Sequence, residues 1–418
     1  MKRFLGIILI LLLLLIVLTY WSVSVYPEEE RISEVISKID SGTPEEKQDD
    51  SVVVITSNLY DANSLKRFMQ GVNYRKAWAA PIEAPVLYLE GFKILEEGGG
   101  KQTHSLDLEG PGGEIFSLRS VNKDPEALIP KAAKTLGLEN IVIDGISAQH
   151  PFGAILAAAL ADAAGILHTH PKIVFLPEQE LLGEYNEKYG NRLFLLEYET
   201  EGEVNWTSLP NVIEIMDTDN LQELKMEYQE RVKIDHRALV RARMFDMLIG
   251  DWDRHAKQWG WVVQKEGEDF IAFPLGGDRD NAFFRIDGVI PTILTNELVQ
   301  PLVRPFEEDI DHVPGFVYPV DVYFLHSTPE EVFVEESKLL QKKLSDEKIE
   351  EAFRVWPDVL NDLNKEEIIK KLKKRRDKLP EYAREFRRTI EKRDVLKKPL
   401  KGSEDLELPE NLQKCFEC

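Results

Sequence analysis

The chain has 418 residues, with 52 basic and 74 acidic side chains and a formal net charge of −22. This balance excludes broad binding to nucleic acid or to an anionic membrane surface, and we expect no nucleic-acid partner. Only two cysteines occur, so no disulfide framework or zinc cluster supports the fold.

The N-terminus carries a hydrophobic segment. Lys2 and Arg3 precede an uncharged apolar run from Phe4 to Leu18, with Trp21 close behind. The run approaches the roughly 20 residues that cross a bilayer, and the two charges favour a cytoplasmic N-terminus. We predict a transmembrane anchor over residues 1–25, with a signal peptide cleaved after residue 24 as the alternative. The rest of the chain is then extracytoplasmic, as the body of a single-pass membrane protein or as a secreted protein.

A solvated acidic stalk is predicted for residues 26–50, with one short helical pattern around Ile32, Val35 and Ile36. A folded region over residues 51–395 follows. Strand patterns occur at 51–56, 86–90, 105–108 and 115–121, and glycine-rich turns separate the last three. Helical patterns at 130–136 and 152–164 and strand patterns at 172–175 and 193–199 come next. These elements predict a small β-rich lobe over about residues 51–190.

A second, mainly helical lobe is predicted over about residues 200–395. Asp235 is a good N-cap for an apolar helix that ends at Gly250. The last helical stretch, 365–392, contains Pro380, which predicts a break, and its basic run at 373–376 is typical of a solvated face. Residues 396–418, with Cys415 and Cys418, are predicted to form a flexible tail. The fold class is therefore α+β with two lobes behind a membrane helix.

Two acidic loops bracket a predicted hairpin after this helix. Residues 251–258, DWDRHAKQ, lie between the helix and a strand at 259–264, and GGDRD at 276–280 follows a second strand at 270–275. Helix, acidic loop, hairpin and acidic loop occur in the order found in protein kinases. A surface network of ion pairs among Asp253, Arg254 and Asp280 is the plainer reading, and two such loops around one hairpin disfavour it.

Phosphoryl transfer requires a metal, a carboxylate that orients or deprotonates the acceptor, and cations around the phosphates. Asp253 is the candidate base, and Gln258 follows it by five residues, the interval between the catalytic Asp and the metal-binding Asn of kinases. Asp278 and Asp280 are the candidate ligands of Mg²⁺ or Mn²⁺, with Gln258 as a third. Arg254 and His255 are expected only to shape the loop.

The sequences LIGDWDRHAKQWGW and FPLGGDRDNAFF resemble the catalytic and metal loops of the CotH family of spore-coat kinases. They are more distantly similar to HipA-type kinases and to secretory-pathway Golgi casein kinases. The resemblance covers residues 85–290 in patches, and only the two acidic loops are specific. It implies a protein-kinase-like fold, ATP, a divalent metal, Asp253 as base, and Asp278 or Asp280 as metal ligand.

On the same template the small lobe supplies the nucleotide contacts. The turn Gly98, Gly99, Gly100 and Lys101 lies between strands and can approach phosphates, although a plain hairpin turn has the same pattern. Strand alternation puts Arg119 and Lys123 on one face, and we favour Lys123 narrowly as the phosphate cation. Glu126 is a possible ion-pair partner. Glu197 and Glu199 also share a face, which predicts adenine or ribose contacts if that face lines the cleft.

The function predicted is a metal- and ATP-dependent phosphotransferase that acts outside the cytoplasm, with a protein as acceptor. Two alternatives use the same fold: transfer of AMP, and a pseudokinase-like envelope binding or assembly module, which Gln258 and Arg119 would suit as departures from the kinase pattern. A hydrolase with a metal on His104, His150, His168 or His170 is disfavoured because these histidines form no clear ligand motif. The sequence does not indicate the oligomeric state.

Overall fold

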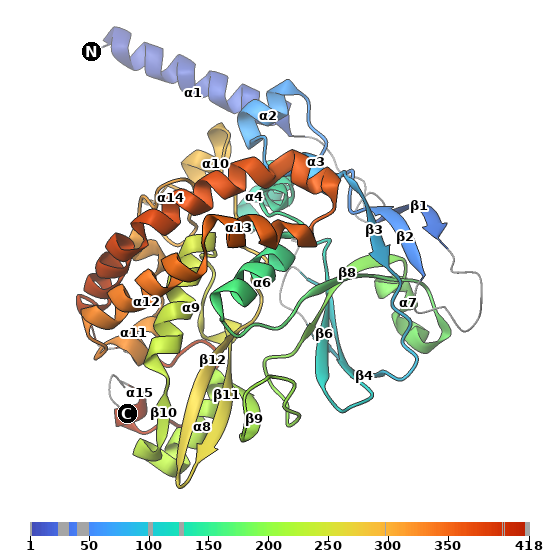
Figure 1. The fold of residues 1–418 in the computed structure, drawn as a ribbon. Coiled ribbons are helices and arrows are strands. Elements are labelled where there is room, and N and C mark those ends of the chain that lie inside the picture. The colour runs from blue at the N-terminus through green and yellow to red at the C-terminus, as the bar shows by residue number, and fades with distance from the viewer. Residues whose placement is uncertain are drawn as a thin grey trace.

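The computed structural model describes residues 2–23, 33–39, 50–98, 103–124, 129–296, 298–394, 396 and 398–413. Several positions named above lie outside these ranges: Gly99, Gly100, Lys101, Glu126, Cys415, Cys418 and most of the predicted stalk. The fold is α+β (Figure 1). The strands are β1 Glu34–Ile39, β2 Ser51–Ile55, β3 Pro81–Pro85, β4 Lys93–Gly98, β5 Ser105–Glu109, β6 Ile115–Ser120, β7 Lys172–Leu176, β8 Arg192–Tyr198, β9 Val212–Asp217, β10 Val232–Ile234, β11 Trp259–Glu266 and β12 Asp269–Gly276. The helices are α1 Lys2–Ser22, α2 Ser64–Gln70, α3 Arg75–Trp78, α4 Lys131–Leu136, α5 Glu139–Gly145, α6 Gly153–Ala164, α7 Asn186–Tyr189, α8 Thr218–Tyr228, α9 His236–Ile249, α10 Val289–Leu294, α11 Pro319–Leu325, α12 Glu330–Lys343, α13 Asp346–Ala352, α14 Asp358–Glu391 and α15 Glu410–Gln413.

An antiparallel sheet with the strand order β4-β5-β6-β8-β7 forms one part of the molecule. Its two faces follow the alternation of the sequence, because successive side chains of a strand point to opposite sides. Leu106, Leu118 and Phe194 are buried in one apolar cluster. Arg119 and Glu197 therefore project to the other face, which is left free to form a polar site.

A second sheet, with the order β10-β12-β11-β9, lies against the helices. Its centre is the predicted hairpin, in which Trp259 of β11 pairs with Gly276 of β12. Helix α9 begins where Asp235 accepts a hydrogen bond from the backbone N–H of Ala238, and it ends at Gly250, whose φ of 71° favours glycine. Both boundaries agree with the sequence prediction. The first acidic loop, residues 251–258, which we call the base loop, therefore starts where expected.

One apolar core connects most of the molecule. It joins Val54 of β2, Leu156 of α6, Phe245 of α9 and Leu379 of α14, all of which are fully buried. The alanine-rich helix α6 lies inside this core because its small side chains allow close packing. The third sheet, β1-β2-β3, contributes to the same core through β2.

Two predictions near the N-terminal end of the body were wrong. The strand expected at 86–90 lies at β3, and Val86 makes only an isolated bridge to Phe175. The sequence did not indicate β3 because a proline stands at each of its ends, and proline disfavours a strand. The two prolines are tolerated because β3 is an edge strand. The helical pattern around Val35 and Ile36 belongs to β1, which pairs with β2 and so is not part of a solvated stalk.

Helix α14 corrects the prediction of a break at Pro380, because it continues through the proline. Proline has no N–H to donate to the carbonyl of Arg376, four residues earlier. The side chain of Gln341 donates to that carbonyl instead, at 2.8 Å. The basic run is also not solvated throughout: Arg375 is fully buried and donates to the carbonyls of Met247, Pro305 and Glu307.

The segment after α14 is not a flexible tail over its described part. Leu400 and Leu408 are buried. The Ser403 hydroxyl is buried between Asp219, to which it donates, and Gln222, from which it accepts. These apolar and polar contacts hold residues 398–413 against the body.

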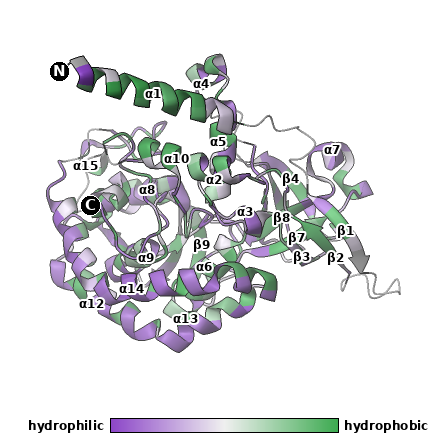
Figure 2. Cartoon of the chain, turned by 90° about the horizontal axis from the view of Figure 1, so that it is seen from above, coloured by the Kyte–Doolittle hydropathy of each residue, from purple (hydrophilic) through white to green (hydrophobic). Residues whose placement is uncertain are grey.

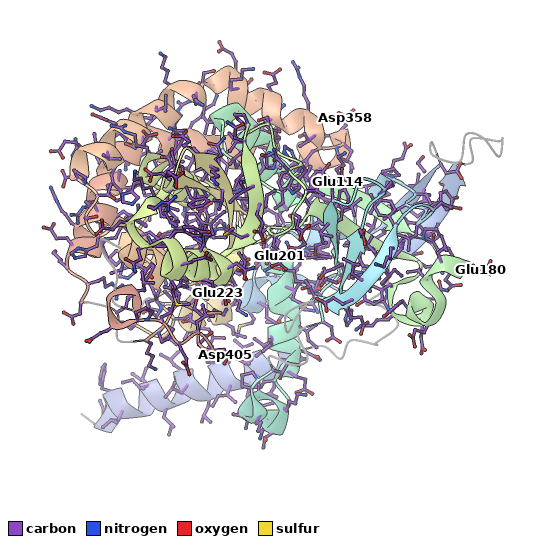
Figure 3. All side chains as sticks on the ribbon, turned by 90° about the horizontal axis from the view of Figure 1, so that it is seen from below. Glu114, Glu180, Glu201, Glu223, Asp358 and Asp405 are labelled. Carbon is purple, nitrogen blue, oxygen red and sulfur yellow. The ribbon has the colours of Figure 1, made fainter. Side chains whose placement is uncertain are left out.

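Helix α1 extends away from the body over most of its length (Figures 1 and 3). Within its span Arg3–Ser22, an 18-residue window has a mean hydropathy of 2.9 and none of that window is buried. Figure 2 shows the helix apolar along most of its length. It is long and apolar enough to cross a membrane, a test that a signal sequence also passes. A second apolar stretch, Glu139–Ala164, is 72% buried and belongs to the core.

Candidate active site

The predicted site residues converge on one cavity of about 740 Å³ between the five-stranded sheet and the two acidic loops. On β5 and β6 the lining residues are odd-numbered, as alternation requires, and they include Arg119; β8 contributes Glu197 and its neighbour Tyr198. The described candidates that line the cavity are Gly98, Arg119, Lys123, Glu197, Glu199, Asp253, His255, Gln258, Asp278 and Asp280. Residues more than 150 apart in sequence thus share one site.

Two ion pairs join the sheet to the second acidic loop. Arg119 Nη2 lies 2.7 Å from Asp278 Oδ1 and 2.8 Å from Glu197 Oε1. Lys123 Nζ lies 2.5 Å from Asp280 Oδ2. Both cations considered for the phosphates therefore point into the cavity, and each is paired with a candidate metal ligand.

The carboxylates of this loop differ in their electrostatic surroundings. Burial alone would raise the pKa of Asp278, but the charges of Arg119 and Lys123 outweigh it and hold that pKa below its ordinary range. Burial and the charge of Asp278 raise the pKa of Asp280. Asp278 also has a positive φ of 50°, a strained conformation that aspartate tolerates better than most residues. Asp278 is thus held as an anion in a fixed orientation.

Asp253 faces the same cavity from the base loop and has no hydrogen bond or ion pair with another described residue. Burial raises the pKa of its carboxyl, and the nearby charge of Asp278 adds to the effect. A free carboxylate with a raised pKa is a better proton acceptor than an ordinary aspartate. His255 is held neutral, because burial and the charge of Lys401 lower its pKa to about 4.

Arg254 connects the two acidic loops from below the cavity. It is fully buried, donates to the carbonyl of Gly277 at 2.6 Å, and donates to the carbonyl of Gln258 at 3.0 Å. Gly277 in turn donates its N–H to Gln258 at 3.1 Å. Arg254 therefore joins the two acidic loops through their backbone carbonyls.

A buried ionic network anchors Arg254. Asp246 of α9 lies 2.8 Å from Arg243, 3.1 Å from Arg279 and 3.3 Å from Arg254, and all four side chains are buried. Charges in this stretch of sequence suggest a solvated surface, so the network was not predicted. The helix that precedes the base loop thus holds both loops through a single carboxylate.

The donor set of the cavity suits a hard divalent cation. Asp278, Asp280 and Gln258 offer only oxygen ligands of the kind that Mg²⁺ or Mn²⁺ prefers. The Gln258 side chain already hydrogen-bonds Asp278, which holds the longer amide near the carboxylates. A metal here would bring charge to phosphate oxygens between these groups and the two cations of the sheet.

Glu197 gives the site a pH-dependent effect on stability. Burial raises its pKa from 4.5 to about 7, despite the opposing charge of Arg119. The folded state therefore binds this proton more tightly than the unfolded state, and the free energy of unfolding falls as pH rises through this window. In the wild type we expect the free energy of unfolding to fall by up to about 3 kcal/mol between about pH 4.5 and 7 because of this group. The Glu197→Gln variant should not show this fall. Urea unfolding at several pH values checks this, and parallel curves for the two proteins would contradict it.

The cavity also contains residues that the sequence did not indicate. Lys401 lines it from the C-terminal segment, beside Lys257 of the base loop. Neither lysine has a carboxylate within ion-pair distance among the described residues. Lys401 reaches the cavity because Leu400 and Ser403 pack against the body. No pattern of neighbouring residues in the sequence predicts that packing. Thr169, which donates to Glu197, also went unnoticed.

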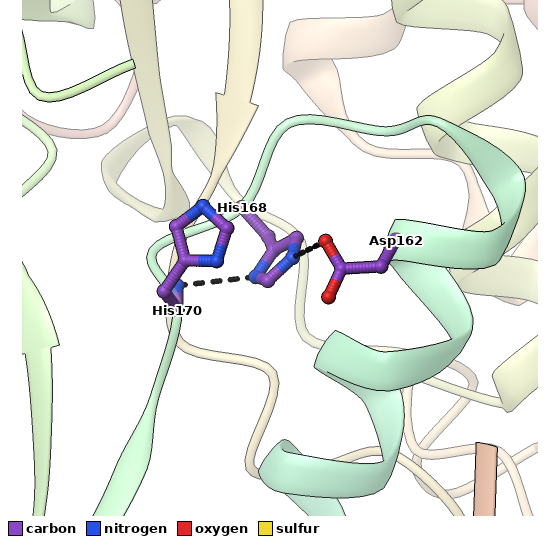
Figure 4. Close-up of side chains that lie close together, drawn as sticks. All are labelled: Asp162, His168 and His170. Carbon is purple, nitrogen blue, oxygen red and sulfur yellow. Dashed lines mark hydrogen bonds and ion pairs between the residues drawn. The ribbon is translucent and has the colours of Figure 1, made fainter. Parts of the chain in front are cut away.

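The histidines considered as metal ligands lie elsewhere. Asp162, His168 and His170 have ligand atoms within 4.8 Å of one another (Figure 4), beside a separate cavity of about 610 Å³. The backbone N–H of His170 donates to His168 Nδ1 at 3.1 Å, so the proton of the neutral ring is on Nε2 and faces Asp162 at 2.9 Å. A metal on Nε2 would require the ring proton on Nδ1, and Nδ1 could then no longer accept the hydrogen bond from the backbone N–H of His170. The two hydrogen bonds of His168 therefore favour a structural role for this histidine over metal binding.

Comparisons with known proteins give limited information. No family model and no curated protein sequence matches the chain. The crystal structure of the Helicobacter pylori proinflammatory kinase CtkA is similar at 13% identity, covers 73% of this chain and 98% of its own, and has a TM-score of 0.38. HipA of Shewanella oneidensis MR-1, in a complex with HipB and operator DNA, is similar at 12% identity, covers 71% of this chain and 67% of its own, and has a TM-score of 0.36. Both TM-scores are below 0.5, and no functional conclusion follows from them.

Proposed function

We propose that this chain is a metal- and ATP-dependent phosphotransferase with a protein-kinase-like fold, most simply a protein kinase. The observation that carries the proposal is the single cavity in which Asp253, Asp278, Asp280, Arg119 and Lys123 meet. Phosphoryl transfer needs a base, metal ligands and phosphate cations in one place, and this cavity offers a candidate for each. The order of elements around the cavity also follows the kinase scheme. Arg119 lies on β6, the third strand of the five-stranded sheet, and Lys123 follows that strand.

In this proposal the two lobes divide the substrate between them. Arg119 and Lys123 hold the phosphates of ATP. Glu197 and Glu199 face the ribose or adenine. A bound Mg²⁺ or Mn²⁺, held by Asp278 and Asp280 with the amide of Gln258, would neutralise charge that develops on the transferred phosphoryl group.

The acceptor binds at the base loop. Asp253 accepts the proton of a hydroxyl, and its raised pKa favours this transfer near neutral pH. Arg254 fixes the spacing between the base and the metal ligands, because it hydrogen-bonds both loops. We further propose that α1 is inserted in a membrane, with Lys2 and Arg3 on the cytoplasmic side, so that the cavity lies outside the cytoplasm.

One departure from the kinase pattern supports an alternative. In protein kinases the lysine on the third strand of the small lobe pairs with a glutamate of a helix. Here Arg119 of β6 pairs instead with Glu197 on the neighbouring strand β8. Such a cation can hold the phosphates in a different register, so transfer of AMP, or binding without turnover, stays a second candidate.

Labelled ATP separates these functions. The purified chain is incubated with Mn²⁺ and either γ-labelled or α-labelled ATP, together with Asp253→Asn and Asp278→Asn. We expect transfer of the γ label by the wild type and by neither variant. Transfer of the α label indicates AMP transfer, and nucleotide binding without transfer indicates a binding module. Label transfer that both variants retain would refute the site, and stoichiometric zinc without nucleotide binding would refute the function.

A further inference from the structure

Exposed apolar side chains gather on one face of the body. Outside α1, those on α2, on α10 and on the turns that follow them form a group that we call the apolar face: Phe68, Val72, Ile293, Leu294, Leu298 and Val299, each between 51% and 90% exposed. Other large apolar side chains of similar exposure in the described chain, such as Leu181 and Val355, are on separate elements. A grouping of this kind marks a surface that another apolar phase covers.

Hydrogen bonds join the elements of this face. The backbone N–H of Val72 donates to Asp287 Oδ1 at 2.5 Å, so the end of α2 is tied to the start of α10. Gly288 and Gly71 are so close that a Cβ on Gly288 would lie 2.3 Å from the Gly71 nitrogen. Helices α2 and α10 are side by side in both Figure 1 and Figure 2. The apolar side chains therefore move as one surface.

The end of α1 is attached directly to the same face. Gln70, the last residue of α2, donates to the Ser22 carbonyl at 2.9 Å and to its hydroxyl at 3.1 Å. The Tyr20 hydroxyl donates to the carbonyl of Leu136 on α4 at 2.9 Å. These contacts come before residue 24, so the end of the apolar helix touches the body directly.

The attachment fixes the depth of the face relative to a bilayer. Tyr20 and Trp21 are 47% and 75% exposed and end the apolar run, where aromatic side chains mark the membrane interface. Gln70 is within one hydrogen bond of that level, and Phe68 and Val72 are two residues to either side of it. Arg67 and Lys131 are also exposed nearby and can reach lipid phosphates.

We propose that the apolar face inserts into the outer surface of the bilayer that α1 crosses, so that the body is held against the membrane. This inference rests on the proposed insertion of α1 and not on the proposed chemistry. The occupant is a lipid surface, because α1 places one within reach of this face. Interfacial helices bind a bilayer in a comparable way, by burying an apolar face in the boundary between headgroups and acyl chains.

The test uses the full chain in vesicles of phosphatidylethanolamine and phosphatidylglycerol. Cys415 and Cys418 are replaced by serine, and a polarity-sensitive fluorophore is attached through Phe68→Cys or Leu298→Cys. Leu181→Cys and Val355→Cys are matched controls, because their side chains are 54% and 44% exposed on other elements. Leu11→Cys reports insertion of α1. Spin-labelled lipid quenches only fluorophores in contact with the bilayer.

We expect lipid-dependent quenching and a blue shift at positions 68, 298 and 11, and neither at 181 or 355. Quenching at 11 while 68 and 298 behave like the controls would overturn the inference and leave the anchor in place. A blue shift at 298 in detergent, unquenched by labelled lipid, would assign the face to a second copy of the chain. No quenching at 11 removes the premise and the inference together. The γ-label assay on the same samples reports the proposed chemistry independently. If a cysteine variant does not fold, Val299→Cys, at a 63% exposed side chain, replaces it.

Discussion

Replacing Asp253 with asparagine is expected to reduce γ-phosphate transfer by about 10² to 10⁴-fold, the usual contribution of a general base. The amide keeps the shape of the carboxylate but cannot accept the acceptor proton. Asp253 has no hydrogen bond or ion pair with another described residue that the substitution would break, and its raised pKa means that the ionised carboxyl costs stability at neutral pH. We therefore expect the variant to unfold at a urea concentration no lower than that of the wild type. Affinity for Mn²⁺ and ATP should change little, because the groups proposed to hold them are on other elements.

The pH profile of the reaction gives a second measure of the same group. The raised pKa of Asp253 means that the base is lost, as pH falls, at a higher pH than for an ordinary aspartate. The acidic limb of kcat should therefore lie above the ordinary titration of aspartate. Asp269→Asn is a matched control, since Asp269 begins β12 beside the hairpin turn and, among the described residues, forms an ion pair with Lys233 alone. Equal losses in the two variants would exclude Asp253 as the base.

The largest effect on stability is expected from Asp246→Asn. Among the described residues, Asp246 is the only carboxylate that Arg243, Arg254 and Arg279 share. Its loss leaves Arg243 paired with Asp321 and Arg254 with Asp251, and it leaves Arg279 without a carboxylate within ion-pair distance in the described chain. Breaking a buried ion pair by removing one partner costs about 3 to 5 kcal/mol. Burial alone would raise the pKa of Asp246, but the three arginines hold it below its ordinary value, so the carboxylate is charged at neutral pH. Urea unfolding measures the loss.

An exposed ion pair supplies the reference for this measurement. Asp269 and Lys233 are 39% and 59% exposed, and such pairs contribute about 0 to 1 kcal/mol. If Asp246→Asn destabilised the chain no more than Asp269→Asn, the network would not be the anchor described above. We also expect slower phosphate transfer in Asp246→Asn at temperatures where it stays folded, because Arg254 would no longer hold both loops in place.

The sequence predicted the parts of the site that local signals mark. The Asp235 cap and Gly250 placed the end of α9, and the strand patterns around Gly267 placed the hairpin, so both acidic loops were located from residues close in sequence. Alternation along β6 and β8 placed Arg119 and Glu197 on cavity-lining faces. These inferences succeeded because each depends on a few neighbouring residues.

The sequence could not predict features that depend on distant partners. Pro380 continues a helix only because Gln341 satisfies the Arg376 carbonyl, and Lys401 reaches the cavity only because Leu400 and Ser403 dock on the body. Charged residues in the buried network look in sequence like solvated ones. The sequence favoured Lys123 over Arg119 narrowly as the phosphate cation, and both residues line the cavity.

The docked C-terminal segment affects how this protein can be handled. A version that stops at residue 395, where helical content ends in the sequence, would lack Lys401 and would uncover the surface that Leu400 protects. Gly402 has a φ of 105°, a backbone conformation that favours glycine, so a larger residue there would strain the docked segment. Affinity tags should therefore follow residue 418 through a spacer, and assays on shortened versions would report a cavity with one wall missing.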